Sequence, residues 1–391
     1  MPKKIKKRHF LDWSILLPYL VLCILGLMMV YSSTSYLLVE ADSNPMASVM
    51  NQFLFWLISL AAIGLIYKLK LDFLRKKGLA GLAIFVILIL LLIVLLFGEE
   101  VNGAKGWLTL GGFSIQPAEY LKIVAIWYLS VSLANRQPDI QTSFLKQVRT
   151  PLLWIGLCLG IIMAMPDFGN AAVILLIVFA VLAASGINYL YTYWLLPVGI
   201  VGSMGAIWVV IATGGKFLPE HVYNRFAIFT NPFADEYNLG HQMVNGYYAM
   251  FNGGLLGRGL GNSIQKKGFL QFAQTDYIFA IVIEELGLIM AILILALLFY
   301  MICRIFLVGI RSKDPFNSLM CIGIGSLFMI QTFVNLGGIT GIIPLTGITF
   351  PFLSQGGSSL LMLSICIGFV LNISAEEKRN KILLDIENSS Y

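Results

Sequence analysis

Asp276 is the residue of this sequence with the clearest potential for chemistry. It follows the basic, glycine-rich segment 257–267 and comes just before an apolar run of membrane length. A carboxylate at the boundary between water and hydrocarbon is energetically costly, so it marks a candidate functional site. Two interpretations stay open. Asp276 is either a general base facing a water-filled cavity or a cap on the following helix, whose dipole favours negative charge at its N-terminus.

Cations accompany this carboxylate along the chain. Arg225, Arg258, Lys266 and Lys267 lie in the same stretch, around glycines whose backbone N–H groups are unhindered. Arginine, lysine and clustered N–H groups together suit phosphate oxygens, so the segment is a candidate site for a diphosphate or a sugar phosphate. The alternative is a surface in contact with solvent or lipid headgroups.

A buried ion pair is predicted at Glu119 and Lys122. The two are three residues apart and share one face of a helix that Pro117 is suited to begin. Ionisable residues inside membranes usually pair and face a cavity, so this pair either neutralises itself or contributes to binding. Trp107, two residues after Lys105, is either an interfacial anchor or a cover for a sugar ring or an isoprenoid chain.

Three further carboxylates are predicted to lie on or beside helices. Glu284 and Glu285 are adjacent and point about 100° apart, so at most one can share a cavity with Asp276. Their alternative role is to position the helix against a neighbour. Asp167 is predicted to cap the sixth apolar run. The three histidines and five cysteines lack the spacing of metal ligands, so they predict no metal site and no disulfide.

These residues need a membrane scaffold to position them. Of the 391 residues, 58% are hydrophobic and 12% are charged, and the mean hydropathy is +0.85. Soluble domains carry about 25% charged residues, so we predict an all-α polytopic membrane protein. About ten runs are long enough to cross about 30 Å of hydrocarbon. They cover residues 13–36, 51–68, 78–97, 117–134, 151–167, 169–186, 189–213, 277–303, 316–336 and 356–374.

The basic residues predict the orientation of these spans. Nineteen of the 26 Lys and Arg residues fall on one side, which places both termini in the cytoplasm and gives no indication of nucleic-acid binding. The chain then divides into a basic N-terminus (1–12), a membrane domain (13–375) and a cytoplasmic tail (376–391). The large loop between spans seven and eight, residues 214–276, is extracellular. The glycine- and proline-rich region 338–355 is a candidate re-entrant segment.

Several motifs, in order along nearly the whole chain, resemble one family. They are GA-x-x-W, IQPAE-x-x-K, PDFG, RF-x-x-F-x-NP, GNS-x-Q-K, TD-[FY]-IFA-x-x-x-EELG and PF-x-S-x-GGSS. Together they resemble the SEDS family, the lipid II glycan polymerases of shape, elongation, division and sporulation. The strings at 261–266 and 354–359 are similar to the FtsW branch of Gram-positive bacteria more than to the RodA branch.

The resemblance implies a peptidoglycan glycosyltransferase that polymerises lipid II on the outer face of the cell membrane, at the division septum. The family's essential aspartate falls on Asp276, and its functional tryptophan on Trp107. Its buried pair falls on Glu119 and Lys122. The chain departs from the family pattern in two places. Gly106 stands where members often carry Arg, and the proline and histidine often found before the aspartate are absent.

The mechanism expected from this resemblance uses Asp276 as the base on the sugar 4-hydroxyl of an acceptor lipid II. That oxygen attacks the anomeric carbon of the growing chain with inversion, and undecaprenyl diphosphate leaves. Arg225, Arg258 and Lys122 are candidates to stabilise the diphosphate, with a divalent cation, Mg or Mn, as the alternative. The candidate substrate-binding residues are Trp107, Lys105, Glu119, Lys122, Arg225, Arg258, Gln265, Lys266 and Ser358.

The resemblance also implies partners. These are a class B penicillin-binding protein, which is a single-span transpeptidase, and other membrane proteins of the division complex. Two other interpretations of the chain stay open. Paired intramembrane charges and broken helices are also typical of transporters, here a lipid II flippase. A non-catalytic division scaffold is the second, and it predicts that Asp276 is dispensable for glycan synthesis.

Overall fold

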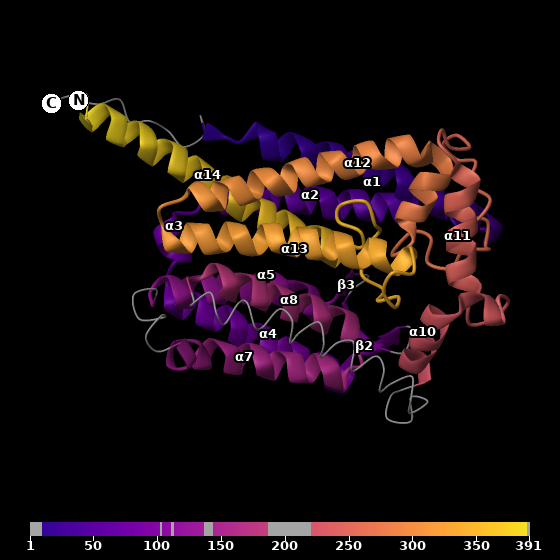
Figure 1. Cartoon of the computed structure of the whole chain (residues 1–391), viewed down its shortest axis with the longest axis horizontal. Coiled ribbons are helices and arrows are strands. Elements are labelled where there is room, and N and C mark those ends of the chain that lie inside the picture. Colours follow the sequence, from indigo (N-terminus) through magenta and orange to yellow (C-terminus); the bar gives the residue numbers. More distant parts are fainter. Residues whose placement is uncertain (1–9, 102–103, 111–112, 137–143, 187–219, 389–391) are drawn as a thin grey trace.

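The computed structural model describes residues 10–101, 104–110, 113–136, 144–186 and 220–388. Within them, long helices run side by side (Figure 1). A small sheet, irregular segments and two shorter helices gather at one end of the bundle, and the four-residue helix Leu71–Leu74 lies at the other. The helices are α1 (Trp13–Glu40), α2 (Ala47–Lys68), α3 (Leu71–Leu74), α4 (Lys77–Phe97), α5 (Pro117–Ala134), α7 (Phe144–Ala164), α8 (Phe168–Ala184), α10 (Glu220–Thr230), α11 (His241–Gly253), α12 (Ile278–Arg311), α13 (Pro315–Ile339) and α14 (Gly357–Asn388).

Nine of the ten predicted spans coincide with helices, and the remaining one, residues 189–213, lies outside the described residues. Seven of the described helices are long and apolar enough to cross a membrane. α8 is apolar but has 17 residues, and α5 carries the charged residues Glu119 and Lys122. The protein is therefore a polytopic membrane protein, as the composition predicts. The seven long helices are α1, α2, α4, α7, α12, α13 and α14.

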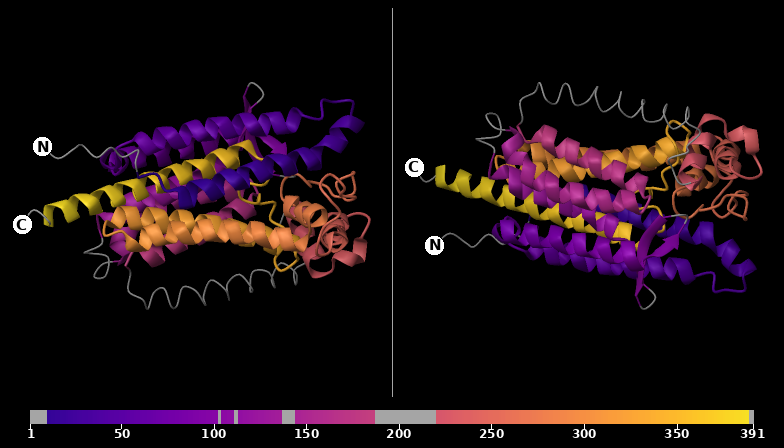
Figure 2. Two further views of the ribbon diagram at one scale, coloured as in Figure 1. Left: turned by 90° about the horizontal axis from the view of Figure 1, so that it is seen from above. Right: turned by 90° about the horizontal axis from the view of Figure 1, so that it is seen from below.

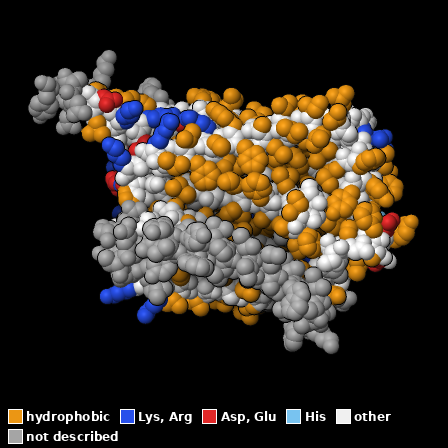
Figure 3. Space-filling view, in the orientation of Figure 1, with side chains coloured by type: hydrophobic (Ala, Val, Ile, Leu, Met, Phe, Trp, Pro, Cys, Tyr) orange, Lys and Arg blue, Asp and Glu red, His pale blue; other side chains and the backbone are white. Residues whose placement is uncertain are grey.

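The surface of the bundle carries a broad hydrophobic band. In Figure 3 hydrophobic side chains cover the sides of the helices, and Lys and Arg gather at the end where both termini lie. On α12, for example, Ile292 and Leu293 are 55% and 56% exposed. A contiguous apolar surface of this extent is rare in soluble monomers and suits contact with hydrocarbon.

A small sheet departs from the all-α prediction. The strands β1 (Glu99–Val101), β2 (Ala104–Leu110) and β3 (Phe113–Ile115) pair antiparallel in the order β1-β2-β3. Two of them have only three residues, so alternation of side chains could not identify them in the sequence. The strand pairing satisfies backbone groups that a loop would leave to solvent, and it fixes the segment that carries Trp107.

The predicted large loop, 214–276, also contains regular structure in its described part. It holds α10, a 3-10 turn η2 (Pro232–Asp235) and α11. Glycines let α11 approach α12 closely, because a Cβ on Gly246 would lie 2.4 Å from the Tyr277 ring. The described part of this segment is thus packed on the bundle rather than extended from it.

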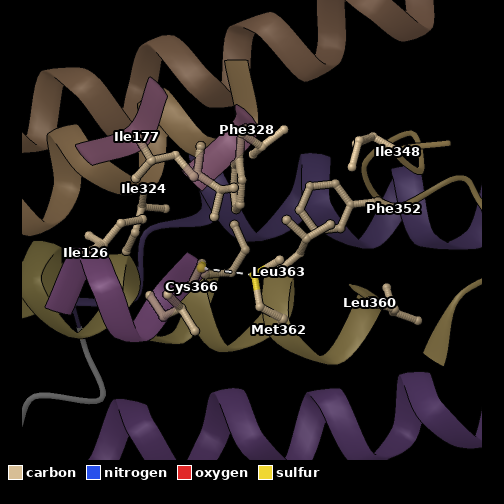
Figure 4. Close-up of a cluster of buried hydrophobic side chains, with 14 of the residues drawn as sticks. Ile126, Ile177, Ile324, Phe328, Ile348, Phe352, Leu360, Met362, Leu363 and Cys366 are labelled. Atoms are coloured by element: carbon tan, nitrogen blue, oxygen red, sulfur yellow. Dashed lines mark hydrogen bonds between the residues drawn. The ribbon is translucent and has the colours of Figure 1, made fainter. Parts of the chain in front are cut away.

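The core is built around α14. This helix runs through the bundle with α2 along one side and α12 and α13 along the other (Figure 2). Its most apolar stretch is 89% buried, the highest share among the seven long helices. Figure 4 shows side chains of this core, including Phe328 of α13 and Leu363 and Cys366 of α14. Phe352, from the segment between those helices, packs edge-on against Phe328 with ring centroids 5.4 Å apart.

Candidate active site

A cavity of about 490 Å³ lies at the end of the bundle opposite the termini. Its walls come from β2, the turn between α7 and α8, α10, α11, the segment before α12 and the segment after α13. This volume falls within the range of small-molecule sites, about 300 to 1,000 Å³. The charged residues that line it are Glu119, Asp167, Arg225 and Asp276.

Asp276 lies on the wall of this cavity and is 7% exposed. The hydroxyl of Thr275 donates a hydrogen bond of 3.0 Å to its Oδ1. Burial raises the pKa of the Asp276 carboxyl to about 6, although the Thr275 hydroxyl, a backbone hydrogen bond and the charge of Arg225 all favour the ionised form. A carboxyl with this pKa is suited to accept a proton near neutral pH.

Asp276 does not cap α12, so the capping interpretation is wrong. The N-cap residue is Tyr277, whose side chain makes no capping bond, and among the described residues no N–H of α12 donates to the Asp276 carboxylate. The Asp167 prediction is confirmed, because its Oδ1 accepts from the N–H of Asn170 at 3.1 Å at the start of α8. Asp167 also lines the cavity, a position that the sequence did not reveal.

The backbone that carries Asp276 is held at three successive carbonyl groups, those of residues 274–276. The first accepts a hydrogen bond from the N–H of Gln355 at 2.8 Å, and the second from the hydroxyl of Ser354 at 2.5 Å. The third accepts from the side-chain amide of Asn335 at 2.7 Å. The segment before α12 is therefore fixed by α13 and by the segment that precedes α14.

The segment between α13 and α14 covers most of the region 338–355, and its re-entrant character stays a prediction. The segment has no helix, yet Ile348 and Phe350 are buried, at 4% and 1% exposed. Buried irregular backbone needs hydrogen-bond partners, and side chains of neighbouring helices supply them. Gln52 of α2 donates to the carbonyl of Ser354 at 3.1 Å and accepts from the N–H of Gly356 at 3.2 Å.

Arg225 is the positively charged residue among the described residues that line the cavity. It comes from α10, and its Nη1 donates to the carbonyl of Leu345 at 3.4 Å. Among the described residues this is the hydrogen bond that the guanidinium makes, so most of its donors have no other partner within them. Arg225 thus brings a fixed positive charge to the same cavity as Asp276.

Glu119 and Lys122 form the predicted buried pair. Lys122 Nζ lies 2.6 Å from Glu119 Oε1, and their side chains are 0% and 6% exposed. Glu119 also lines the cavity, and its second oxygen, Oε2, has no hydrogen-bond partner among the described residues. Lys122 does not line the cavity. Lys122 therefore pairs with one oxygen of Glu119, and the other oxygen is a buried acceptor without a partner among the described residues.

The β2 and α14 candidates occupy different positions. Trp107 lines the cavity and is partly exposed, whereas Lys105 is exposed on β2 and does not line it. The hydroxyl of Ser358 accepts from the N–H of Gln116 at 3.2 Å and donates to the carbonyl of Ser114 at 3.1 Å. Ser358 therefore joins α14 to the start of α5 and lies behind the cavity wall.

The glycine-rich segment binds an anion, but the anion belongs to the protein itself. The N–H groups of Ile264 and Gln265 donate to the Glu284 carboxylate at 3.0 and 3.4 Å. The N–H of Gly261 donates to Glu285 at 3.0 Å. Neither glutamate lines the cavity. The N–H groups that a phosphate would need are therefore already occupied by two carboxylates of α12.

The cations of this segment are also turned away from the cavity. Lys266 Nζ lies 2.7 Å from Glu285 Oε1 and 2.8 Å from the hydroxyl of Ser32 on α1. Gln265 is buried beside it, and Arg258 is exposed, with its backbone N–H donating to the carbonyl of Glu284. These three residues pack the segment onto α12 and do not line the cavity.

The fold and this site define a polytopic membrane protein with an internal, carboxylate-lined cavity. The profile of a family described as cell cycle protein, FtsW, RodA and SpoVE, matches residues 12–379. The chain belongs to this family. The probable peptidoglycan glycosyltransferase FtsW of Lactococcus lactis is 44% identical, over 97% of this chain and 96% of that protein. The protein of the same name from Bacillus subtilis is 37% identical, over 97% and 95%.

Solved structures agree with this assignment. A chain from a structure described as the structural coordination of polymerization and crosslinking by a peptidoglycan synthase complex has a TM-score of 0.72 and 25% identity, covering 93% of this chain and 97% of that one. The rod shape determining protein RodA of Thermus thermophilus has a TM-score of 0.66 and 23% identity, covering 93% and 96%. The second likeness is one of fold.

Proposed function

We propose that this protein is a peptidoglycan glycosyltransferase that polymerises lipid II into glycan strands on the outer face of the cell membrane, for septal wall synthesis in cell division. The observation that carries the proposal is the position of Asp276, a buried carboxyl with a pKa of about 6 in the same cavity as Arg225. The names of the relatives in Lactococcus lactis and Bacillus subtilis support the same reaction class.

Asp276 acts as the general base in this reaction. It removes the proton from the 4-hydroxyl of the acceptor sugar while that oxygen forms a bond to the anomeric carbon of the growing chain. The bond from the anomeric carbon to the diphosphate oxygen breaks with inversion, and its electron pair leaves with undecaprenyl diphosphate. Asp276 then releases its proton to water. Arg225 stabilises the negative charge that develops on the diphosphate.

The remaining candidates take different roles in this proposal. Glu119 accepts a hydrogen bond from a substrate hydroxyl at the cavity wall, Lys122 pairs with Glu119, and the Trp107 ring covers a sugar face. The exposed cations Lys105 and Arg258 meet lipid headgroups or the diphosphate of arriving substrate. Ser358 supports the cavity wall at Gln116, whereas Gln265 and Lys266 anchor the glycine-rich segment to α12.

A divalent cation lacks a cluster of protein ligands within the part of the chain that the structure describes. Among the described residues, no three side chains of His, Cys, Asp or Glu lie where they could hold a metal ion together. Stable Mg²⁺ or Mn²⁺ sites rely on carboxylate and other oxygen ligands in a defined geometry. We therefore derive no step through a metal ion.

The orientation and partners belong to the same proposal. Lys and Arg gather at the end of the bundle that carries both termini. Because cytoplasmic ends of membrane spans are rich in Lys and Arg, both termini face the cytoplasm. The cavity then faces outward, where lipid II is consumed. A class B penicillin-binding protein supplies cross-linking, which agrees with the fold likeness to a chain of a peptidoglycan synthase complex. Other membrane proteins of the division complex recruit the pair to the septum.

The test is polymerisation of purified lipid II by the protein with a class B partner whose transpeptidase is inactivated. We expect long strands from the wild type and a loss of at least about 100-fold in rate for Asp276→Asn, because a general base contributes about 10²- to 10⁴-fold. Asp235→Asn, which changes a carboxylate on η2 outside the cavity, should retain the wild-type rate.

Each other result has a defined meaning. Equal synthesis by the wild type and Asp276→Asn would show that Asp276 is not the base. It would support the interpretation of the protein as a division scaffold, for which Asp276 is dispensable. No synthesis by the wild type, together with lipid II movement across vesicles that contain it, would favour the flippase.

A further inference from the structure

The side-chain amide of Asn335 joins two segments that build the cavity. Its Nδ2 donates to the carbonyl of Asp276 at 2.7 Å and to the carbonyl of Ile348 at 2.8 Å. Asp276 and Ile348 both line the cavity, and Asn335 lies outside it, 3% exposed on α13. An amide nitrogen carries two protons, so both donors are used, one for each wall segment.

A second amide on the same face of α13 extends this arrangement. Gln331, one turn before Asn335, donates to the carbonyl of Thr349 at 3.1 Å and lies 3.3 Å from its hydroxyl. The Thr349 hydroxyl in turn makes a hydrogen bond of 3.0 Å with Ser359. Both Thr349 and Ser359 line the cavity. Asn335 and Gln331 of α13 therefore hold the consecutive wall residues 348 and 349. Of these two amides, Asn335 also reaches the Asp276 carbonyl.

A buried side-chain amide on a membrane-length helix needs hydrogen-bond partners. Polar side chains within apolar surroundings are costly unless their hydrogen bonds are made. The carbonyls of Asp276 and Ile348 explain Asn335, because both belong to irregular backbone that cannot pair within a helix. Among the described residues the Asp276 carboxylate accepts from the hydroxyl of its neighbour Thr275 and from no N–H of α12, so its direction depends on how this stretch of backbone is held.

We propose that Asn335 is a positioning residue for Asp276. By fixing the Asp276 carbonyl relative to that of Ile348, the amide sets the direction in which the carboxylate faces the substrate. It also couples that direction to the wall segment 346–349. This inference rests on the proposed function of Asp276 as the base. Misplacement of a catalytic group by about 1 Å costs about 100-fold in rate, so loss of the amide should act on the chemical step.

The chain offers a matched control in Asn372 of α14. Its Nδ2 donates to the carbonyls of Ile66 and Leu69 at 2.6 and 3.0 Å, and the residue is 0% exposed. Asn335 and Asn372 are thus both buried asparagines that bridge two backbone carbonyls. Asn372 meets the C-terminal end of α2 and lines no part of the cavity.

The experiment compares Asn335→Leu and Asn372→Leu with the wild type in the lipid II polymerisation assay, with the inactivated partner present. Each substitution removes two carbonyl contacts, so we expect both to lower the melting temperature in detergent. Asn335→Leu should lower kcat about 100-fold while KM for lipid II stays within about threefold. Asn372→Leu should leave both constants within about threefold of the wild type.

Asn335→Ser covers the case in which the leucine variant does not fold. The serine hydroxyl carries one donor, so this variant should show a kcat between those of Asn335→Leu and the wild type, or about 10-fold below the wild type if the leucine variant yields no protein. Equal loss of kcat in Asn335→Leu and Asn372→Leu would overturn the proposal, as would a wild-type kcat for Asn335→Ser.

Asp276→Asn in the same assay separates the two proposals. If Asp276→Asn is as active as the wild type, the role of Asp276 as the base fails and the role of Asn335 fails with it. If Asp276→Asn is inactive and Asn335→Leu keeps the wild-type kcat, Asp276 remains the base and only the positioning role is overturned.

Discussion

The rate of glycan polymerisation should fall in mild acid, because Asp276 must be ionised to accept a proton. With a pKa of about 6, its carboxyl is about 90% ionised at pH 7 and about 10% ionised at pH 5, so kcat should drop about tenfold between them. A carboxyl at the reference value of 3.8 would be more than about 90% ionised at both pH values, and the rate would be nearly constant.

Replacing Arg225 moves this transition in a known direction. The guanidinium lowers the pKa of Asp276, so Arg225→Gln should raise that pKa and shift the midpoint of the rate profile to higher pH. Arg311→Gln is the matched control, since Arg311 is an exposed arginine at the far end of α12. It should leave the midpoint where it is in the wild type.

The assay is the initial rate of strand formation at saturating lipid II, measured between pH 5 and pH 8 at constant ionic strength. Recovery of the full rate after return to pH 7 checks that neither protein has unfolded in acid. A kcat that stays constant between pH 5 and pH 7 would refute the assignment of Asp276 as the base. A midpoint near pH 6 that Arg225→Gln does not move would refute the electrostatic role of Arg225.

Three further predictions concern stability. Because burial raises the pKa of Asp276, the folded protein binds its proton more tightly than the unfolded chain between about pH 4 and pH 6, and stability falls as pH rises through that window. Asp276→Asn should therefore raise the free energy of unfolding at pH 8 by at most about 3 kcal/mol for a pKa difference of about two units, measured as a higher melting temperature. Lys122→Met leaves the Glu119 carboxylate unpaired and should destabilise the protein by about 3 to 5 kcal/mol, whereas the double variant with Glu119→Gln should recover most of this loss in a melting experiment. Glu285→Gln should speed hydrogen exchange at the amide of Gly261, which donates to that carboxylate, and unchanged exchange would contradict the anchoring role.

Much of the scaffold follows from local patterns in the sequence. Runs of apolar residues locate the long helices because each helix satisfies its own backbone and presents side chains to hydrocarbon. Pro117 begins α5 as predicted, and the three-residue spacing of Glu119 and Lys122 brings their side chains together because neighbours on a helix face are set by its period. The cap at Asp167 is local for the same reason.

The site depends on contacts between distant parts of the chain, which no local pattern encodes. Arg258, Gln265 and Lys266 have the composition of a phosphate site, yet their segment folds onto Glu284 and Glu285 about 20 residues later. Tertiary packing decides whether the N–H groups of this segment bind a phosphate or a carboxylate of the protein itself.

Asn335 gave no signal in the sequence at all. A single amide within an apolar run has no period, and its two partners are backbone carbonyls 59 and 13 residues away. Hydrogen bonds to backbone groups are independent of the partner's residue type, so the sequence of the partner segments carries no mark of them.

The contact between Gln52 and Ser354 has a consequence for the synthesis of this protein. The two residues are 302 positions apart, and at about 5 to 20 residues per second a ribosome needs about 15 to 60 seconds to travel from one to the other. During that interval Gln52 has already entered the membrane with α2, while the backbone it will hold has not been made. The first spans of the newborn chain are therefore made long before its cavity is complete, and the cavity closes only after the segment before α14 has been added.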